Sequence, residues 1–104
     1  MKMVLLFLPC ANEEEAEKIT QSLLEKHLIV CGKKTPVSSA YFWKGKIEKS
    51  GETLLILESV EENYEEIEKE VRKIHSYETF VLSAISVIRY SKGVETWLKE
   101  GLKK

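Results

Sequence analysis

The stretch YFWKGKIEKSGE at positions 41–52 places three aromatic residues side by side and follows them with lysine, glycine, glutamate and serine. Neighbouring side chains of a β-strand point to opposite faces of the sheet, so Tyr41, Phe42 and Trp43 cannot all enter one small core. At least one face of this strand therefore needs a cover from elsewhere. The KSG sequence at 49–51 is typical of a turn, and we expect it to join two strands.

Apolar patterning on either side of this segment predicts four strands and three helices. The strands are expected at 2–8, 29–46, 53–57 and 79–90, the second one interrupted near Thr35 and Pro36, where a ladder donor is lost. The helices are expected at about 13–28, 60–75 and 92–101. This order indicates an α+β fold, a ferredoxin-like βαββαβ sandwich with a four-stranded antiparallel sheet and a short C-terminal helix.

Capping-box patterns support the starts of the two main helices. Asn12 is followed three places later by Glu15, and Ser59 is followed in the same way by Glu62. The inner side of the terminal helix is expected to carry three residues: Val94, Trp97 and Leu98.

One face of the predicted sheet has no cover. The first and third strands are apolar on both faces, as Leu5 beside Leu6 and Leu54 beside Leu55 show. The two main helices cover only one face, so the open face needs a partner. We expect the aromatic segment to run past its own sheet and to pair with another subunit.

Composition limits the class of protein. A chain of 104 residues with 43% hydrophobic and 32% charged residues is typical of one globular domain, here spanning 1–104. No apolar run is long enough to cross a membrane, and no secretory signal is expected, because the first apolar run passes directly into a helix. A net charge of -1 gives no positive field to hold a nucleic acid.

The cysteines indicate a cellular compartment, and the choice of charged residues indicates heat adaptation. The two cysteines have neither CxxC spacing nor a disulfide framework, so free thiols in a reducing cytoplasm are expected. All 17 acids are glutamate, and lysine dominates the bases, which is typical of heat-adapted proteins.

Enzymatic patterns are missing from the sequence. It has no nucleotide-binding glycine motif and no aspartate for paired-carboxylate or magnesium chemistry. We therefore expect a non-catalytic protein.

Copper and similar metals favour thiolate and imidazole ligands. The candidate ligands are Cys10, Cys31, His27, His75 and Glu78. These residues are scattered, and plainer interpretations stay open. The two cysteines can be small hydrophobic residues at strand ends, and His75 can be a polar residue that interacts with the dipole at a helix C-terminus.

Two further groups have similar alternatives. Tyr41 and Trp43 could bind a ligand, but packing in a subunit interface explains them better. The glutamate-rich segment 61–70 could attract cations, but a solvated helix face explains it better.

Three blocks of the sequence resemble the CutA divalent-ion tolerance proteins. SSAYFWKGKIEKSGETLLI is similar to the family's SxYxWxGxI…E segment, PCANEEEAEKI to its TCPNEEEAEKI-like start, and HSYE at 75–78 to its HPYE. The residues that match the first segment are Ser39, Tyr41, Trp43, Gly45, Ile47 and Glu52. The resemblance covers nearly the whole chain.

The resemblance implies a homotrimer of ferredoxin-like subunits whose long hairpins wrap their neighbours. It also implies tolerance of divalent cations and binding of copper or another divalent metal in clefts between subunits, with no metal required for folding. The implied ligands are Cys31, His75 and Glu78. The implied cleft-lining or interface residues are Cys10, Ser39, Tyr41, Trp43, Glu52 and Tyr77.

This chain departs from the family's pattern next to the implied site. Phe80 stands where the family has a second proline, and Val81 where it has a second glutamate. A copper site without that carboxylate should be weaker than in relatives that keep it. The alternative function is a non-catalytic structural trimer, or a PII-like regulatory protein that binds a small ligand in the same cleft.

Overall fold

Strand β1, Met3–Cys10, forms the inner part of a four-stranded antiparallel sheet in the computed structural model, which describes residues 1–102. It pairs with β3, Lys46–Val60, on one side and with β4, Ser83–Ser86, on the other. Strand β2, Cys31–Trp43, lies at the outer edge beside β3, so the order is β2-β3-β1-β4. Each of the two edge strands, β2 and β4, has no neighbouring strand on its outer side among the described residues.

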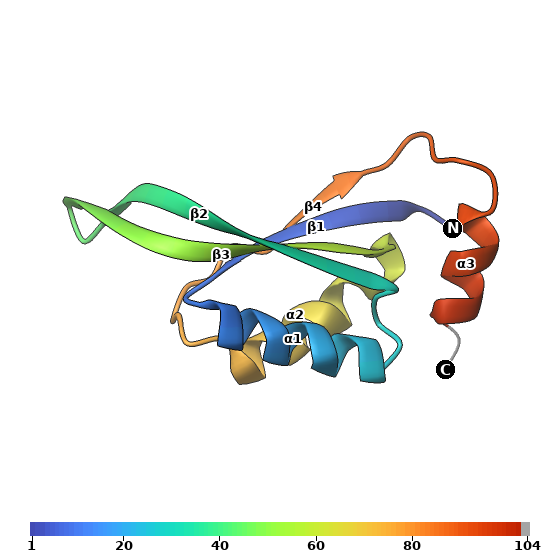
Figure 1. The fold of residues 1–104 in the computed structure, drawn as a ribbon, viewed down its shortest axis with the longest axis horizontal. Helices are drawn as coiled ribbons and strands as arrows, with labels where there is room; N and C mark the ends of the chain where they lie inside the picture. The colour runs from blue at the N-terminus through green and yellow to red at the C-terminus, as the bar shows by residue number, and fades with distance from the viewer. Residues whose placement is uncertain (103–104) are drawn as a thin grey trace.

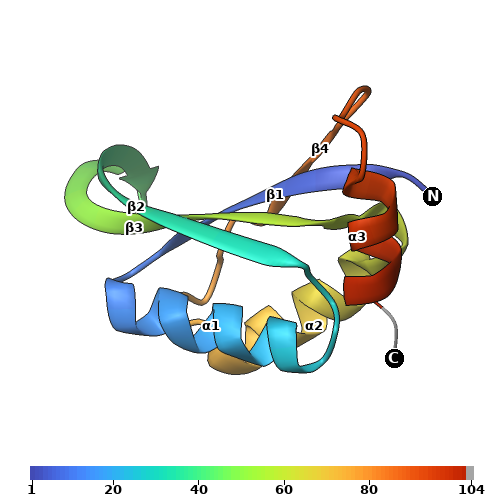
Figure 2. The same cartoon turned by 45° about the vertical axis from the view of Figure 1, so that its right-hand side comes forward.

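Helices α1, Glu13–Glu25, and α2, Tyr64–Ile74, lie side by side on one face of this sheet (Figures 1 and 2). A short 3-10 helix, η1, Glu61–Asn63, precedes α2. Helix α3, Val94–Gly101, lies at one end of the sheet, near the start of β1 (Figure 1). The predicted α+β, ferredoxin-like arrangement is therefore confirmed.

The core lies between the helices and the sheet. Alternate residues of β1 and β3 face α1 and α2 because side chains alternate along a strand. The largest fully buried side chains there are Leu6, Leu8, Leu55, Leu57, Ile19, Leu23 and Ile67. The intervening strand residues are only half-buried, and the apolar ones are Leu5, Phe7, Leu54 and Ile56. The expected open apolar face is thus present in the single chain.

The hairpin turn lies elsewhere than predicted. Trp43 pairs with Lys46, so the connection is the two residues Lys44 and Gly45, with φ of 51° and 79°. Positive φ at both central residues is the geometry that keeps hairpin strands twisted correctly. The KSG segment at 49–51 lies inside β3 instead, so the predicted turn there was wrong, and β3 is much longer than 53–57.

Strand β2 is continuous through Pro36, where an interruption was predicted. Pro36 pairs with Thr53 in the ladder between β2 and β3. The prediction was wrong because β2 is an edge strand, where a proline can turn its missing donor outwards.

The N-cap predicted at Asn12 is confirmed. The side chain of Asn12 accepts a hydrogen bond from the Glu15 backbone N–H at 2.8 Å. The predicted cap at Ser59 was wrong, because that residue is buried and its hydroxyl donates to the Leu28 carbonyl. Helix α1 ends at Glu25 rather than 28, since the chain turns there through a left-handed residue, His27, with φ 56°.

The C-terminal third contains shorter elements than predicted. Strand β4 has four residues rather than spanning 79–90, because only this part meets β1. The apolar residue Ile88 is 89% exposed in the single chain. Helix α3 starts after Gly93, whose φ is 97°. Only Leu98 of its three expected inner residues is buried, and Trp97 is 45% exposed.

Candidate metal centre

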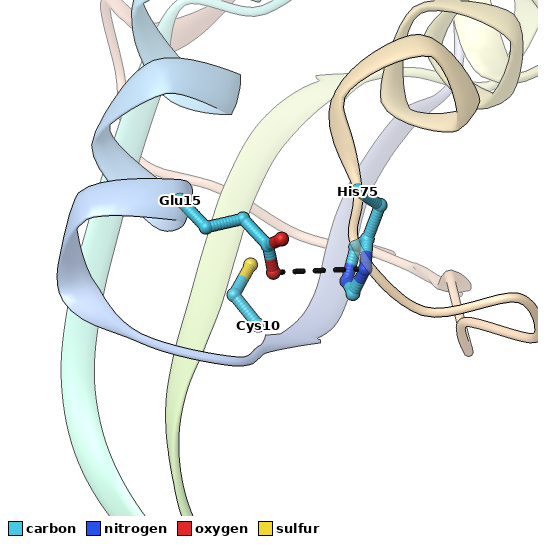
Figure 3. Close-up of side chains that lie close together, drawn as sticks. All are labelled: Cys10, Glu15 and His75. Carbon is cyan, nitrogen blue, oxygen red and sulfur yellow. Dashed lines mark ion pairs between the residues drawn. The ribbon is translucent and has the colours of Figure 1, made fainter.

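Three side chains from three elements meet where β1 ends. Cys10 is the last residue of β1, Glu15 lies in the first turn of α1, and His75 follows the last residue of α2 (Figure 3). One ligand atom of each lies within 4.8 Å of the other two, and all three residues are buried. We call this group the Cys10–Glu15–His75 cluster.

Hydrogen bonds from two backbone N–H groups hold the Glu15 side chain in the cluster. Its Oε2 atom accepts a hydrogen bond from the Ala11 backbone N–H at 2.9 Å, so the side chain turns back towards the end of β1. Its Oε1 atom accepts from the Ser76 N–H at 2.7 Å. One carboxylate thus joins the start of α1 to the loop that leaves α2.

Backbone contacts define the tautomer of His75. Its Nε2 atom lies 2.9 Å from the Pro9 carbonyl oxygen and must donate, because a carbonyl only accepts. Its Nδ1 atom accepts from the Tyr77 N–H at 3.1 Å and lies 3.6 Å from Glu15 Oε2. The lone pair of the imidazole therefore belongs to Nδ1, which faces Glu15.

Burial and hydrogen bonds determine the protonation of Cys10 and Glu15. Burial, followed by the carboxylates of Glu15 and Glu52, raises the pKa of the Cys10 thiol to about 12. The thiol donates to the Leu8 carbonyl, with 3.7 Å between the sulfur and the oxygen. For Glu15, burial raises the pKa, but the hydrogen bonds from Ala11 and Ser76 outweigh it and hold the pKa below its ordinary value. The cluster thus contains a thiol and a carboxylate at neutral pH.

The donor set fits a thiol-preferring metal ion. Sulfur and imidazole nitrogen are the ligands that copper and zinc accept readily. A histidine that binds a metal usually donates its other N–H to a carbonyl or carboxylate, as His75 does to Pro9. A bound ion would have to displace the Cys10 proton and the Tyr77 N–H. Such a site gains affinity as the pH rises.

The structure separates the ligands that the resemblance implied. His75 belongs to the cluster, but Cys31 pairs with Glu58 at the far end of the sheet. Its side chain lies on the open face, where the Lys33 ammonium is 3.2 Å from its sulfur. Glu78 is exposed in the loop after α2. Within one chain, neither Cys31 nor Glu78 reaches His75.

The expected cleft residues lie in three places: Tyr77 beside Glu52, three residues on β2, and Cys10 in the cluster. Tyr77 donates to the Glu52 carboxylate at 2.6 Å, and burial together with this hydrogen bond raises the pKa of Tyr77. Tyr41 contacts Ser50 on the hairpin, with 3.3 Å between their oxygens. Ser39, Tyr41 and Trp43 follow one another at alternate positions of β2 and share one face. Cys10 lies in the cluster.

Sequence reasoning missed Glu15 as a ligand candidate. Its capping-box position was recognised, but only as a helix start. The available signal was that the capped helix begins three residues after Cys10, so a carboxylate that turns back reaches the strand end.

No helix among residues 1–102 is long and apolar enough to cross a membrane.

Comparison with known proteins gives one consistent result. Residues 4–101 match the family model of the CutA1 divalent ion tolerance protein. A divalent-cation tolerance protein CutA from Thermotoga maritima is 36% identical over 100 residues, which are 96% of this chain and 99% of the relative.

Solved structures agree with this match. The periplasmic divalent cation tolerance protein CutA of Archaeoglobus fulgidus superposes with a TM-score of 0.94 at 34% identity, covering 97% of this chain and 99% of the other. CutA1 of Pyrococcus horikoshii gives 0.91 at 29% identity over the same shares.

Proposed function

Because the chain belongs to the CutA1 family of divalent ion tolerance proteins, we propose that it binds copper or another thiol-preferring metal ion as a non-catalytic homotrimer. The donor set is Cys10, Glu15 and His75. The observation that carries this proposal is the convergence of three ligand types from three elements within 4.8 Å. When bound, the metal would be held by the thiolate of Cys10 and the Nδ1 atom of His75, with the Glu15 carboxylate balancing its charge.

Subunit assembly is the second part of the proposal. The half-buried apolar face of the sheet and the projecting hairpin support contacts with further copies of the chain. Cys31 and Glu78 would join a metal site only if a neighbouring subunit brought them to it. Two free cysteines support a cytoplasmic location.

A structural trimer without metal is the second candidate. In the described residues, every buried side-chain nitrogen and oxygen already has a hydrogen-bond partner. The cluster could therefore join β1, α1 and the loop after α2 without any ion.

Copper titration of the purified protein, with metal counted per subunit, separates these candidates. We expect Cys10→Ser to abolish stoichiometric binding and Cys31→Ser to retain it. Affinity should rise by about tenfold per pH unit between about pH 6 and about pH 8, because each bound ion releases the Cys10 proton. Val81→Glu should tighten binding only if the donor set implied by the resemblance, with Cys31 and Glu78, holds the ion, because Val81 is exposed and lies outside the Cys10–Glu15–His75 cluster.

Other results would change the conclusion in defined ways. Loss of binding in Cys31→Ser alone would favour the donor set implied by the resemblance, assembled across subunits. Equal, weak binding in all variants at both pH values would leave the structural trimer as the better account.

A further inference from the structure

The imidazole of His75 has no exposed surface, although it lies beside an exposed loop. Two rings from that loop contact it. The Tyr77 ring is tilted by 54° at a centroid distance of 4.7 Å, and the Phe80 ring is stacked at 21° and 5.2 Å. The loop that follows His75 thus folds back over its own histidine.

A cation also contacts the Phe80 ring. The Arg72 guanidinium is 4.6 Å from the centroid of the Phe80 ring, a favourable cation–π distance. Arg72 is also held by Glu68, one helical turn earlier, at 3.1 Å. Arg72, Phe80 and His75 therefore form a layered contact from the surface of α2 to the cluster.

Hydrogen bonds hold the loop over 76–82 at both of its ends. The Ser76 N–H donates to Glu15 at one end, and the Tyr64 hydroxyl donates to the Leu82 carbonyl at 2.7 Å at the other. Between these anchors Thr79 and Val81 are exposed, while Phe80 is half-buried against the core. Rotation of the Phe80 side chain would remove one of the two rings that cover the imidazole while both anchors stay in place.

From these contacts we propose that the Phe80 side chain, held in place by Arg72, is a gate: it must move before a metal ion can reach the Cys10–Glu15–His75 cluster. The inference rests on the proposed metal site for its cargo, but the gate itself is a property of this chain. Neither Phe80 nor Arg72 supplies a ligand atom, so the gate controls the rate of entry rather than the affinity. The charge of Arg72 at the entrance also slows the approach of cations.

Chemical modification of the metal-free protein tests the gate directly. Diethyl pyrocarbonate acylates unprotonated imidazole nitrogen, and the chain has two histidines, so exposed His27 serves as the internal reference for His75. Peptide mass spectrometry then gives the ratio of the two modification rates.

We expect Phe80→Ala to raise the His75 to His27 ratio by about tenfold or more, because opening no longer requires breaking the stack. Arg72→Gln, on the exposed side of α2, should raise the ratio by a smaller factor. The matched control is Val81→Ala, which removes an exposed apolar side chain from the same loop and should leave the ratio unchanged. A ratio in Phe80→Ala and Arg72→Gln equal to that of the wild type would overturn the proposal. Should Phe80→Ala fold poorly, Arg72→Gln and Phe80→Leu carry the test.

Cadmium uptake distinguishes failure of the gate from failure of the metal site. Charge-transfer absorbance of the cadmium–thiolate bond reports entry, and Phe80→Ala should speed it with unchanged affinity. If no variant binds cadmium or copper but the modification ratio still rises, the gate stands and the metal proposal fails. If cadmium binds at the same rate in all variants and the ratio is constant, the gate is wrong and the metal site stands.

Discussion

The carboxylate of Glu15 accepts hydrogen bonds from two distant parts of the chain. One oxygen binds Ala11 at the start of α1, and the other binds Ser76, which lies 61 positions later. A side chain at this position therefore stabilises the helix start and also holds the loop that carries His75. Because the folded pKa of Glu15 is below its ordinary value of 4.5, its contribution to stability is present above that pH and is lost as the pH falls through the folded pKa.

Replacing Glu15 by Gln should lower the free energy of unfolding by about 1–3 kcal/mol at neutral pH, because an amide cannot accept from both N–H groups. Acidification below about pH 4.5 should also destabilise this variant less than it destabilises the wild type. Urea unfolding at neutral and acidic pH measures both effects. Glu14→Gln, at an exposed neighbour that pairs with Lys18, is the control and should change stability by less than about 0.5 kcal/mol. Equal losses in the two variants would show that Glu15 has no special role.

At the residue scale, local sequence patterns predict the role of an individual residue better than they predict contacts between residues far apart in the chain. The cap formed by Asn12 and Glu15 was predictable, because capping is decided by residues three places apart. The contact between Glu15 and His75 was not, because it depends on how α2 ends beside β1. Separation in sequence hides such contacts from any local pattern.

At the scale of elements, the hairpin of β2 and β3 extends beyond the rest of the sheet. β1 ends at Cys10, opposite Thr53, so the part of the hairpin nearer the turn has only two strands (Figure 1). A two-stranded ribbon is marginally stable in water by itself. Its aromatic side chains are largely uncovered, with Phe42 78% and Trp43 43% exposed. We therefore expect contacts from outside this chain to cover the ribbon.

Truncation of Trp43 to Ala tests whether those contacts exist. If a neighbouring subunit buries the indole, the free energy of unfolding should fall by about 3–5 kcal/mol, whereas the exposure in a single chain predicts a much smaller loss. Thermal unfolding at several protein concentrations measures the loss and its dependence on assembly. Lys49→Ala, an exposed hairpin residue, is the control. An unchanged melting temperature in Trp43→Ala would show that the indole stays in water.

The existence of the hairpin was predictable, but the position of its turn was not. Gly45 suits a positive φ, but Lys44 adopts one that lysine rarely takes, so only one of the two turn residues marked the position. The sequence KSG supplied a stronger turn signal at 49–51, and the long ladder overrode it. Register here is decided by the pairing of many residues rather than by turn propensity.

At the scale of the whole molecule, the two faces of the sheet differ. The helices cover one face (Figure 2), whereas the other face presents half-buried apolar residues and the segment after β4 exposes Ile88. The apolar pattern over 79–90 predicted a long strand, but only Ser83–Ser86 forms a β-ladder with β1 among the described residues. An apolar pattern indicates that side chains are covered, but it does not indicate whether the covering residues belong to the same chain or to another subunit. The order of elements was therefore predictable, whereas the length of β4 was not.

We expect a homotrimer in solution, because association would cover the open face, the hairpin and Ile88 together. Light scattering at micromolar concentration should give three times the chain mass of 12.0 kDa, about 36 kDa. Ile88→Lys should shift the protein to smaller species, since an unpaired ammonium buried in an interface costs several kcal/mol, yet it should preserve the subunit fold because this side chain is exposed in the single chain. Gln21→Lys, on the exposed side of α1, adds the same charge away from the open face and should leave the mass unchanged. A stable monomer for the wild type, or a trimer that tolerates Ile88→Lys as well as it tolerates Gln21→Lys, would contradict this assembly.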